Sequence, residues 1–548
     1  MQPLQVGISN LKTLKDLQLQ YWKFYIPMLA LTMPRNLNGF VANFFAGHLH
    51  SDSIITGIGI GQMMVYCIPY SCMMGFNMLF ECYAGAISVN SSKNDEKLIG
   101  LLFMKCVLQG VLVFFLVLGP FLNTVHLISF LGNDAATHAA AVQFIRVACP
   151  WPLLMHIQEL LVKFLVVQGH LKTPIVVGLT SLGLHSFILY MLVDVLDWAV
   201  VGVALAQSLT ALGTIAGTFF YCRYYGGTIP LKRELTGELW RGWREMMKLG
   251  TFTGCRVVSA NCLYILSSII CQVGGPVTAG TTVIVDRINV LFNMLVYSGG
   301  SATAFVVGSE LGSGKKSRVK KAMFIGVVNW VVERSISLFV FFFTVELIGK
   351  LLTVTETILI GITKCKPAVA ILYILFGLDE LLAQGFLTPM GRQAVIGITA
   401  PLSIFLLGYP LMFYLVYCTK TGAAGIFWCF VASHILQCLV YLARLAFVTI
   451  DEEIQLSGER VDRGFHNKDG QDCTEFESEL SGAECEHVEQ LAYGTDNSNK
   501  NNKAANQTVD MKQLLDEQHQ DSLLSVKGGI GIVLVILFIA TTTAVSFI

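Results

Sequence analysis

The stretch YILFGLDELLAQGFLTPMGRQ, residues 373–393, places two adjacent carboxylates, Asp379 and Glu380, in the middle of an apolar run. A run of this length and hydropathy is typical of a membrane-spanning helix. A charged side chain at the bilayer centre costs about 2.5–3.5 kcal/mol on insertion scales, so acids at that depth are expected to face protein or water and to be functional. The stretch therefore predicts both a membrane fold and the centre of a site.

The composition of the whole chain predicts the same surroundings. Of its 548 residues, 54% are hydrophobic and only 14% are charged, and the mean hydropathy is +0.62. So few polar side chains cannot cover a soluble globule. The equal numbers of basic and acidic residues, 37 and 37, leave no basic excess for a nucleic acid. We predict an all-α polytopic membrane protein that has the lipid bilayer as a partner and no nucleic acid.

About twelve apolar stretches of 20 or more residues precede a polar tail. Two pairs of glycines at the same separation, Gly85 with Gly308 and Gly202 with Gly425, indicate that these stretches form two copies of a six-helix unit. Copies with an even number of spans enter the membrane from the same side, and transporters built in this way bind substrate between the halves. We predict two six-helix lobes related by pseudo-two-fold symmetry, plus a thirteenth C-terminal helix.

Basic residues gather in alternate connections and most densely in the connector between the halves. Because cytosolic loops carry such an excess, we expect a multi-pass protein of the plasma membrane with a cytosolic N-terminus and an extracellular C-terminus. The tail is acidic and poor in aromatic residues, which predicts disorder. The expected segments are a cytosolic N-terminus (1–21), a first lobe of helices 1–6 (22–223), a basic cytosolic connector (224–245), a second lobe of helices 7–12 (246–449), a disordered cytosolic tail (450–526) and the thirteenth helix (527–548).

No motif of an enzyme or of an ATP-driven pump is present in the sequence. It lacks a Walker A motif, an HExxH motif and a GxSxG motif. Its fifteen cysteines form no CxxC pair and no spaced Cys/His cluster, so they read as small apolar side chains. We expect no enzyme activity, no cofactor and no metal.

Seven short motifs follow one another between about residues 20 and 450. They are FFAGHLH (44–50), GFNMLFECYAGAISVNSSKND (75–95), KFLVVQGHLKTPIVVG (163–178), VVGVALAQSL (200–209), VVGSELGSGKKS (306–317), PMGRQAVIG (389–397) and LGYPLMF (407–413). In order and spacing they resemble the multidrug and toxin extrusion (MATE) transporters of the animal type, which also end in a polar tail and one more span. The resemblance implies an antiporter that exports small organic cations in exchange for protons by alternating access of two lobes.

The charged residues of the second half depart from that family pattern. Animal members carry glutamates in the seventh and eighth helices, whereas this chain has Arg256 in the seventh, and Asp286 followed by Arg287 in the eighth. The acid of the tenth helix is kept, as Asp379 or Glu380. Two alternatives follow from the departure. One is a carrier of anionic or zwitterionic substrates, and the other is a transport-inactive membrane scaffold or receptor that works through its tail.

Helical geometry distinguishes the two acids of the opening stretch, because adjacent helical residues point about 100° apart. Glu380 shares its face with Tyr373, Gly377 and Gln384. We therefore predict Glu380 as the carboxylate that binds the proton and the substrate, and Asp379 as its structural partner. A structural ion pair is the alternative for both.

Further polar residues recur at helical spacing on the first and eighth helices, where they should face protein or water. Besides Glu380 and Asp379, the candidates for contact with a proton or substrate are Thr32, Asn36, Asp286, Asn289, Asn293, Tyr297, Tyr373 and Gln384. Polar and small residues at these spacings also pack helices together, which is the alternative for each. Because an unpaired arginine would repel a cation, we expect Arg35, Arg256 and Arg287 to be structural charge partners, and Glu81 and the Glu159/Lys163 pair to be structural as well.

Overall fold

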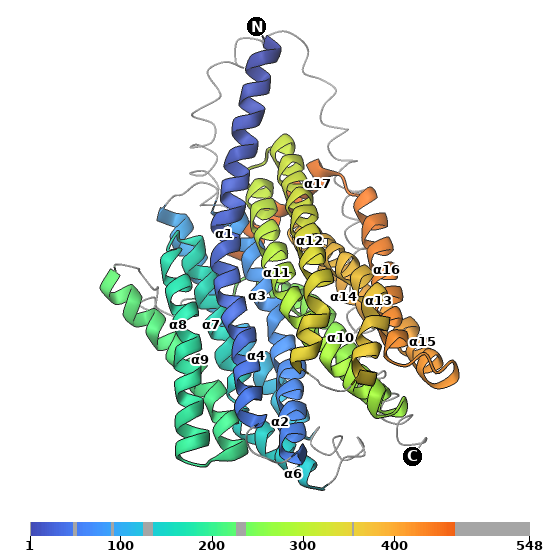
Figure 1. Cartoon of the computed structure of the whole chain (residues 1–548). Helices are drawn as coiled ribbons and strands as arrows, with labels where there is room; N and C mark the ends of the chain where they lie inside the picture. Colours follow the sequence, from blue (N-terminus) through green and yellow to red (C-terminus); the bar gives the residue numbers. More distant parts are fainter. Residues whose placement is uncertain are drawn as a thin grey trace, which may run out of the picture. The chain divides into compact units, whose positions relative to one another are not determined.

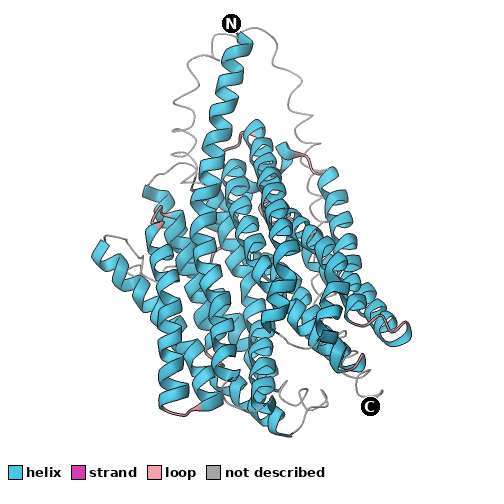
Figure 2. Ribbon diagram, viewed as in Figure 1, coloured by secondary structure: helices cyan, strands magenta, loops and turns pink. Residues whose placement is uncertain are grey.

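Helices coincide with all twelve apolar stretches in the computed structural model (Figures 1 and 2). The structure describes residues 2–47, 52–88, 93–123, 135–225, 237–352 and 356–465, and this part of the chain contains no strand. The expected thirteenth helix and most of the expected tail lie outside the described residues. The prediction of an all-α fold is confirmed.

The first half of the chain contributes six helical stretches. They are α1 (Gln2–Gly47); α2 (Asp52–Val65) continued by η1 (Tyr66–Tyr70) and α3 (Ser71–Ile87); α4 (Lys93–Asn123); α6 (Ala135–Val147) with α7 (Trp151–Val167); α8 (Lys172–Leu189) with η3 (Tyr190–Val195); and α9 (Ala199–Tyr225). Helices α6 and α7 meet at a bend of 46°. A short turn, η4 (Gly237–Trp240), leads from the connector to the second half.

The second half contributes six more stretches and one additional helix. The stretches are α10 (Trp243–Val273); α11 (Pro276–Gly312); α12 (Lys316–Leu352); α13 (Glu356–Glu380) with η5 (Leu381–Leu387); α14 (Gln393–Leu402) with η6 (Ser403–Gly408), α15 (Tyr409–Phe413) and η7 (Tyr414–Cys418); and α16 (Ala423–Ala446). The additional helix is α17 (Ile450–Phe465). The segments η1, η3, η5, η6 and η7 are π-helical.

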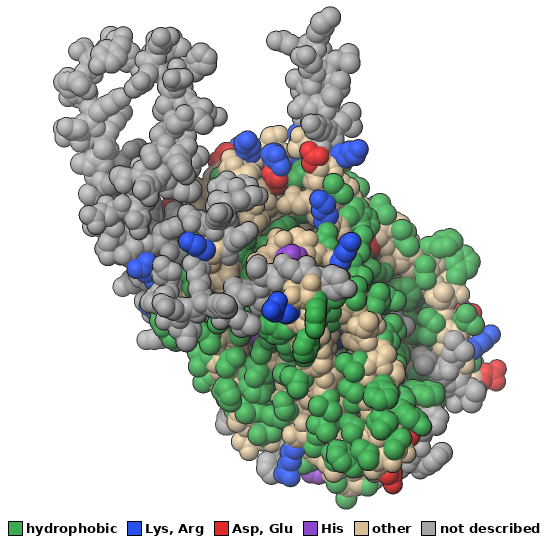
Figure 3. Space-filling model, turned by 90° about the vertical axis from the view of Figure 1, so that its left-hand side faces the viewer, with side chains coloured by type: hydrophobic (Ala, Val, Ile, Leu, Met, Phe, Trp, Pro, Cys, Tyr) green, Lys and Arg blue, Asp and Glu red, His purple; other side chains and the backbone are tan. Residues whose placement is uncertain are grey.

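The surface of the helices is that of a membrane protein. Within the described residues, nine helices are long and apolar enough to cross a bilayer, or ten if the bent pair α6 and α7 is counted as one span. Helices α1 and α12 fall outside that set; α12 carries an acid and an arginine, Glu333 and Arg334, near its middle. Figure 3 shows a face that is mostly hydrophobic, with the charged side chains gathered toward its two ends.

The predicted internal repeat is visible where α3 crosses α11. A Cβ atom added to Gly85 would lie 2.6 Å from the carbonyl oxygen of Phe305, and one added to Gly308 would lie 2.8 Å from the carbonyl oxygen of Cys82. Gly85 and Gly308 are repeat equivalents, and Cys82 and Phe305 are equivalents at the same separation. The two contacts are therefore copies of one another, as a pseudo-two-fold axis through this crossing requires.

The second glycine pair shows the same symmetry. A Cβ atom on Gly202 would lie 3.1 Å from the carbonyl oxygen of Leu192. One on Gly425 would lie 2.1 Å from Oγ1 of Thr421 and 3.2 Å from the Cβ atom of Leu415, the repeat equivalent of Leu192. Leu192 lies in η3 and Leu415 in η7, which are π-helical turns at equivalent places in the two halves. The repeat predicted from four glycines is confirmed at both pairs.

Small residues bring the two halves into close contact. Helix α3 of the first half packs on α10 and α11 of the second, and α1 packs on α11. A Cβ atom on Gly75 would lie only 2.1 Å from the carbonyl oxygen of Gly250. The ring of Phe24 stacks on that of Phe305, with 4.6 Å between their centroids. By contrast, α2 and α6 pack on α1, α9, η1 and each other, all within the first half.

The structure corrects two of the expected boundaries. Helix α1 begins at Gln2 and not near residue 22, and Leu17 and Tyr21 are buried in an apolar cluster that includes side chains of α11. The expected disordered tail begins with the helix α17. The tail as a whole is polar, but its first residues form an amphipathic helix. Ile450 and Ile454 on that helix pack against an apolar cluster made mostly of second-half side chains.

Candidate functional site

The two carboxylates of the opening stretch share one arginine. Glu380 ends α13, and its Oε2 atom lies 2.6 Å from Nη2 of Arg256 on α10. The same Nη2 atom lies 2.8 Å from Oδ2 of Asp379. All three side chains are buried. The predicted pairing of Arg256 with an acid is observed, although one guanidinium serves two acids that were expected to face different surroundings.

Tyr373 and Gln384, two of the residues expected on the face of Glu380, contact different parts of the molecule. Tyr373 packs in an aromatic cluster with Phe292 and Phe341, at centroid distances of 5.4 and 4.9 Å. Gln384 reaches across to the first half of the chain. Gln384 nevertheless stays on the face of Glu380, because a Cβ atom placed on Gly300 would lie 2.9 Å from Cγ of Glu380 and 3.6 Å from Cβ of Gln384.

A histidine that the sequence analysis did not select completes this group. His434 lies on α16, and its Nδ1 atom is 3.9 Å from Oδ2 of Asp379. Its ring stands edge-on to that of Phe376, with 5.5 Å between the centroids. A single histidine in an apolar helix is a weak signal in a sequence, and only the folded chain brings it to the acid. We call Arg256, Asp379, Glu380 and His434 the second-half cluster.

The first half contains a buried ion network of its own. Nη1 of Arg35 on α1 lies 3.0 Å from Oε2 of Glu159 on α7 and 2.9 Å from the hydroxyl of Tyr70. Nζ of Lys163 lies 2.7 Å from Oε1 of Glu159 and 2.6 Å from Oε1 of Glu81 on α3. We call Arg35, Glu81, Glu159 and Lys163 the first-half network. It contains two cations and two carboxylates, so its charges cancel.

The internal repeat relates these two charged groups. Arg35 and Arg256 are 221 residues apart in the sequence, and so are Glu159 and Glu380. The ion pair between α1 and α7 is thus repeated between α10 and α13. The two halves carry the same arginine–carboxylate pair at equivalent positions.

The halves differ one turn after the repeated carboxylate. Lys163 follows Glu159 by four residues, and the residue that follows Glu380 by four is the uncharged Gln384. Its Nε2 atom donates a hydrogen bond of 2.8 Å to Oε2 of Glu81, while Lys163 binds the other oxygen of the same carboxylate. Glu81 is therefore held between equivalent residues of the two halves.

Counting formal charges over both groups leaves one negative charge. Arg35, Lys163 and Arg256 supply three positive charges. The two acids of each half supply four negative charges, and His434 is counted as neutral. Because the first-half network is balanced, the excess lies in the second-half cluster. A buried charge that is costly to leave unbalanced favours a counter-charge, and among the described residues of the two groups no further cation supplies one, so this cluster can accept one proton or one cation.

The other candidate residues are spread along α11 and α1. Gly300 packs on Glu380, with a Cβ atom placed there only 2.9 Å from Cγ of Glu380. Asp286 precedes Gly300 by four turns, about 21 Å along α11. The buried Asn289 and Asn293 lie between these two positions. The polar stripe of α11 therefore leads away from Glu380, and the side chain of Arg287 lies outside the described residues.

The candidates nearer the middle of the molecule line a small cavity between the halves. Tyr297 and Thr32 take part in its wall, and Thr32 Oγ1 donates to the carbonyl oxygen of Met28 at 2.6 Å. Arg35, Glu159 and Lys163 contribute the charged part of the wall. Asn36 is half-buried beside Arg35 on α1. The cavity has a volume of about 20 Å³, which is room for roughly one water molecule.

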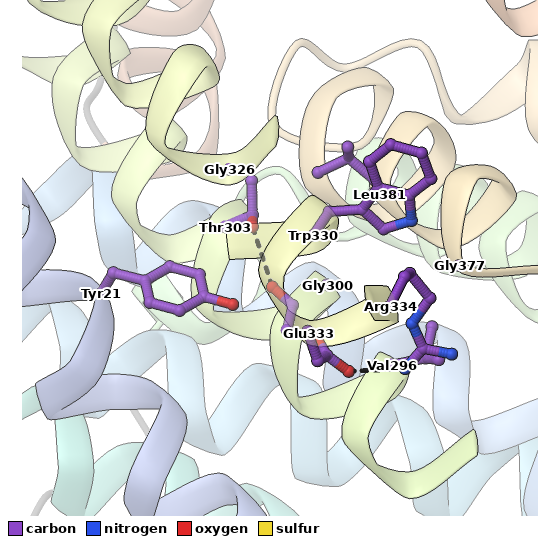
Figure 4. A pocket seen from close by; sticks show the side chains of 11 residues that line it. Tyr21, Val296, Gly300, Thr303, Gly326, Trp330, Glu333, Arg334, Gly377 and Leu381 are labelled. Atoms are coloured by element: carbon purple, nitrogen blue, oxygen red, sulfur yellow. Dashed lines mark hydrogen bonds and ion pairs between the residues drawn. The ribbon is translucent and has the colours of Figure 1, made fainter. Parts of the chain in front are cut away.

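A second small cavity, of about 10 Å³, lies between α1, α11, α12 and α13 (Figure 4). Its wall includes Tyr21, Glu333, Arg334 and Trp330. Glu333 and Arg334 pair with each other at 2.7 Å, so this charged pair is balanced. Neither cavity is large enough for an organic molecule, and neither is lined by Asp379 or Glu380.

Several named proteins are similar in sequence to this chain over most of its length. Multidrug and toxin extrusion protein 1 of Pongo abelii is 23% identical over 424 residues, which are 74% of this chain and 70% of that protein. Protein DETOXIFICATION 31 of Arabidopsis thaliana is 23% identical over 457 residues, which are 80% of this chain and 84% of that protein.

Solved structures share the fold. The eukaryotic MATE transporter AtDTX14 superposes with a TM-score of 0.74 at 18% identity, over 82% of this chain and 100% of that chain. A MOP superfamily transporter from Pyrococcus furiosus, described as having a binding pocket of reverse polarity, superposes with a TM-score of 0.64 at 12% identity, over 82% of this chain and 96% of that chain. At these identities the likeness concerns the fold alone.

The family model named MatE matches this chain twice, over residues 27–191 and 255–414. The matches fall in the two halves that the glycine contacts relate to each other, and together they cover more than half of the sequence. The chain therefore belongs to the MatE family of membrane transporters.

Proposed function

We propose that this transporter exports small organic cations and takes up a proton for each cation released. The observation that carries the proposal is the single uncompensated negative charge of the second-half cluster, where Arg256 faces both Asp379 and Glu380. A proton on one of the acids neutralises the cluster, and so does a monovalent cation next to the ionised pair. One excess charge supports the exchange of one proton for one cation.

The competition between proton and cation follows from burial. Glu380 is only 1% exposed, so water cannot stabilise its charge. An opposite charge nearby favours the ionised carboxylate, whereas burial favours the protonated one. Binding of the cation therefore promotes loss of the proton, and binding of the proton promotes release of the cation. In this scheme Glu380 and Asp379 bind the exchanged species, and Arg256 holds the two acids in place.

Movement of the two halves would give the substrate access. The cavity between the halves has room for about one water molecule in this conformation. A repeat with its axis along the membrane normal supports rocking of one half against the other around a central site. The basic residues of the connector support a cytosolic placement of the connector and of the N-terminus. We place the protein in the plasma membrane, with its C-terminus on the extracellular side.

The test is transport by the purified full-length chain in proteoliposomes with an imposed pH gradient. Radiolabelled tetraethylammonium should accumulate in vesicles with an acidic interior, and an external pH dye should report about one proton leaving the vesicle for each cation that enters. Glu380→Gln should remove this exchange. Glu333→Gln is the matched control, because it also alters a largely buried acid paired with an arginine, with 15% of its side chain exposed, but lies outside the cluster. Tetraethylammonium uptake at a rate that does not depend on the pH gradient would refute the proposal.

A second candidate is a carrier of anionic or zwitterionic substrates. Two cations, Arg35 and Lys163, line the cavity between the halves together with one acid, Glu159. The same vesicles can be offered p-aminohippurate as an anion and carnitine as a zwitterion. Preference for either over tetraethylammonium would favour this candidate. No transport of any of the three would favour a membrane scaffold or receptor.

A further inference from the structure

Glu81 lies where the two halves of the molecule are joined. Its side chain is fully buried on α3, and its two oxygens are bound from opposite sides. Lys163 of the first half lies 2.6 Å from Oε1, and Gln384 of the second half lies 2.8 Å from Oε2. The carboxylate thus belongs to the first-half network through one oxygen and contacts the second half through the other.

The position of Glu81 on α3 makes this hydrogen bond sensitive to separation of the halves. Cys82, the next residue, and Gly85, one turn later, form the symmetric crossing with α11. At this crossing the backbones of α3 and α11 are so close that a single Cβ atom on Gly85 would lie 2.6 Å from a carbonyl oxygen. If the halves part at the crossing, the bond between Glu81 and Gln384 must lengthen and break.

The groups that face Glu81 determine what breaking that bond costs. Lys163 comes from α7 with Glu159 behind it, and Gln384 comes from η5, one turn after Glu380. A buried carboxylate needs its acceptor positions filled. Ser301 of α11 also forms a hydrogen bond with Glu81, so if Gln384 leaves, Ser301 and Lys163 remain, and Lys163 is shared with Glu159. The charged form of Glu81 therefore favours the conformation in which the halves touch.

We propose that Glu81 is a positioning residue for transport, which ties the segment carrying the second-half cluster to the first half. Gln384 lies in η5 directly after Glu380, so its bond to Glu81 fixes that segment while the α3–α11 crossing is closed. When the halves part, the hydrogen bond between Gln384 and Glu81 breaks and η5 is free to move. When they close, the bond forms again. The role of Glu81 in transport rests on the proposed exchange, whereas the tie itself can be measured without transport.

Hydrogen–deuterium exchange on the full chain in lipid nanodiscs tests the tie. Gln384→Ala removes the bond and leaves every charge in place. We expect amides of residues 79–88 and 303–312, the two sides of the crossing, to exchange about three- to tenfold faster, as expected for one lost hydrogen bond. Gln393→Ala is the matched control, because Gln393 is also buried but bonds within its own half, to the carbonyl oxygen of Thr388 at 2.9 Å.

Equal exchange at the crossing in the Gln384→Ala and Gln393→Ala proteins would overturn the inference. Transport adds a second readout: Gln384→Ala should change the maximum rate of tetraethylammonium exchange more than the apparent KM, as expected for a group that acts through movement. An unchanged maximum rate in a chain that does exchange cations for protons would also overturn it. If the wild-type chain exchanges no cation for protons and the crossing still loosens, the proposed function fails and the tie stands.

Discussion

Lys163 and Gln384 occupy equivalent positions in the two halves of the chain, and they bind the two oxygens of one carboxylate, that of Glu81. Within the two charged groups, the halves differ in charge at three equivalent positions: Lys163 against Gln384, Glu81 against Ala304, and Gln158 against Asp379. The first two differences cancel, so the added acid, Asp379, leaves the second half with the uncompensated charge. A duplicated helix unit can thus give one half a structural role and the other an exchange site through changes at a few side chains.

Exchanging the equivalent residue tests the charge count directly. Gln384→Lys would place a cation one turn after Glu380, as Lys163 stands after Glu159. The second-half cluster would then be balanced without a proton or a substrate. We expect tetraethylammonium–proton exchange to fall at least tenfold, because an attraction of about 1.4 kcal/mol between substrate and site is enough for that factor. Uptake in proteoliposomes is the measurement.

The control for this variant is Gln384→Met, which removes the hydrogen bond to Glu81 and adds no charge. It should reduce exchange less than Gln384→Lys does. Equal loss in both proteins would show that the bond, and not the charge, is what matters at this position.

The reverse change tests the first-half network. Lys163→Gln would leave Glu81 and Glu159 buried with Arg35 as the remaining cation of the network. Removing one partner of a buried ion pair costs about 3–5 kcal/mol. We expect a clear fall in the thermal unfolding midpoint of the purified protein in detergent. Lys163→Gln combined with Glu81→Gln removes one charge of each sign and should recover a large part of the loss; a double variant less stable than Lys163→Gln alone would contradict the network.

Sequence reasoning found the spans and the repeat because both depend on local or periodic information. Each span is an apolar run, and the glycines recur because close helix crossings exclude larger side chains. The shared pairing of Arg256 could not be found in this way, since the arginine is 123 residues from Asp379 and its helix offers no periodic clue. Of the residues expected on the face of Glu380, Gln384 packs against Gly300 together with Glu380, whereas Tyr373 lies in an aromatic cluster with Phe292 and Phe341. The sequence around Glu81 indicates a structural role, because none of its neighbours in the sequence shows that it bridges two halves.

The arginine of the second-half cluster should be essential for folding as well as for exchange. Arg256→Gln would leave Asp379 and Glu380, adjacent and buried, with no arginine between them. Two like charges at this separation cannot both stay ionised in a buried site. We expect a large drop in the thermal unfolding midpoint and loss of cation–proton exchange. Adding Glu380→Gln to this variant should recover stability and leave exchange absent, whereas recovery of exchange would contradict the role given to Glu380.

Close approach of the halves at α3 predicts a steric effect. Gly75→Ala would bring a methyl group to within 2.1 Å of the carbonyl oxygen of Gly250, so α3 and α10 would have to move apart. We expect faster hydrogen exchange along α3 and slower transport, because the closed contact forms less often. Gly183→Ala is the matched control, since a Cβ atom there meets no atom within 4 Å. Equal behaviour of the two variants would show that the contact is not limiting.

Helix α17 should be held against the second half mainly by one acid. Glu453 is fully buried, and its Oε1 atom accepts a hydrogen bond of 2.7 Å from Nε of Arg392. Burial lowers the pKa of the neighbouring Arg460, whose Nη1 atom donates to the carbonyl oxygen of Met390 at 2.7 Å. Because Arg392 is partly exposed, the loss on Glu453→Gln should be about 2 kcal/mol, below that of a fully buried pair.

Limited trypsin digestion measures whether α17 stays docked. Release of the helix exposes Arg460, so Glu453→Gln should speed cleavage after this residue by about 30-fold, the factor that corresponds to 2 kcal/mol. Glu452→Gln is the control, because Glu452 is largely exposed and lies 3.8 Å from Arg392; its cleavage rate should match that of the wild type. If the two variants are cleaved equally fast, α17 is held by its apolar face, through Ile450 and Ile454, and the buried acid contributes little to its docking.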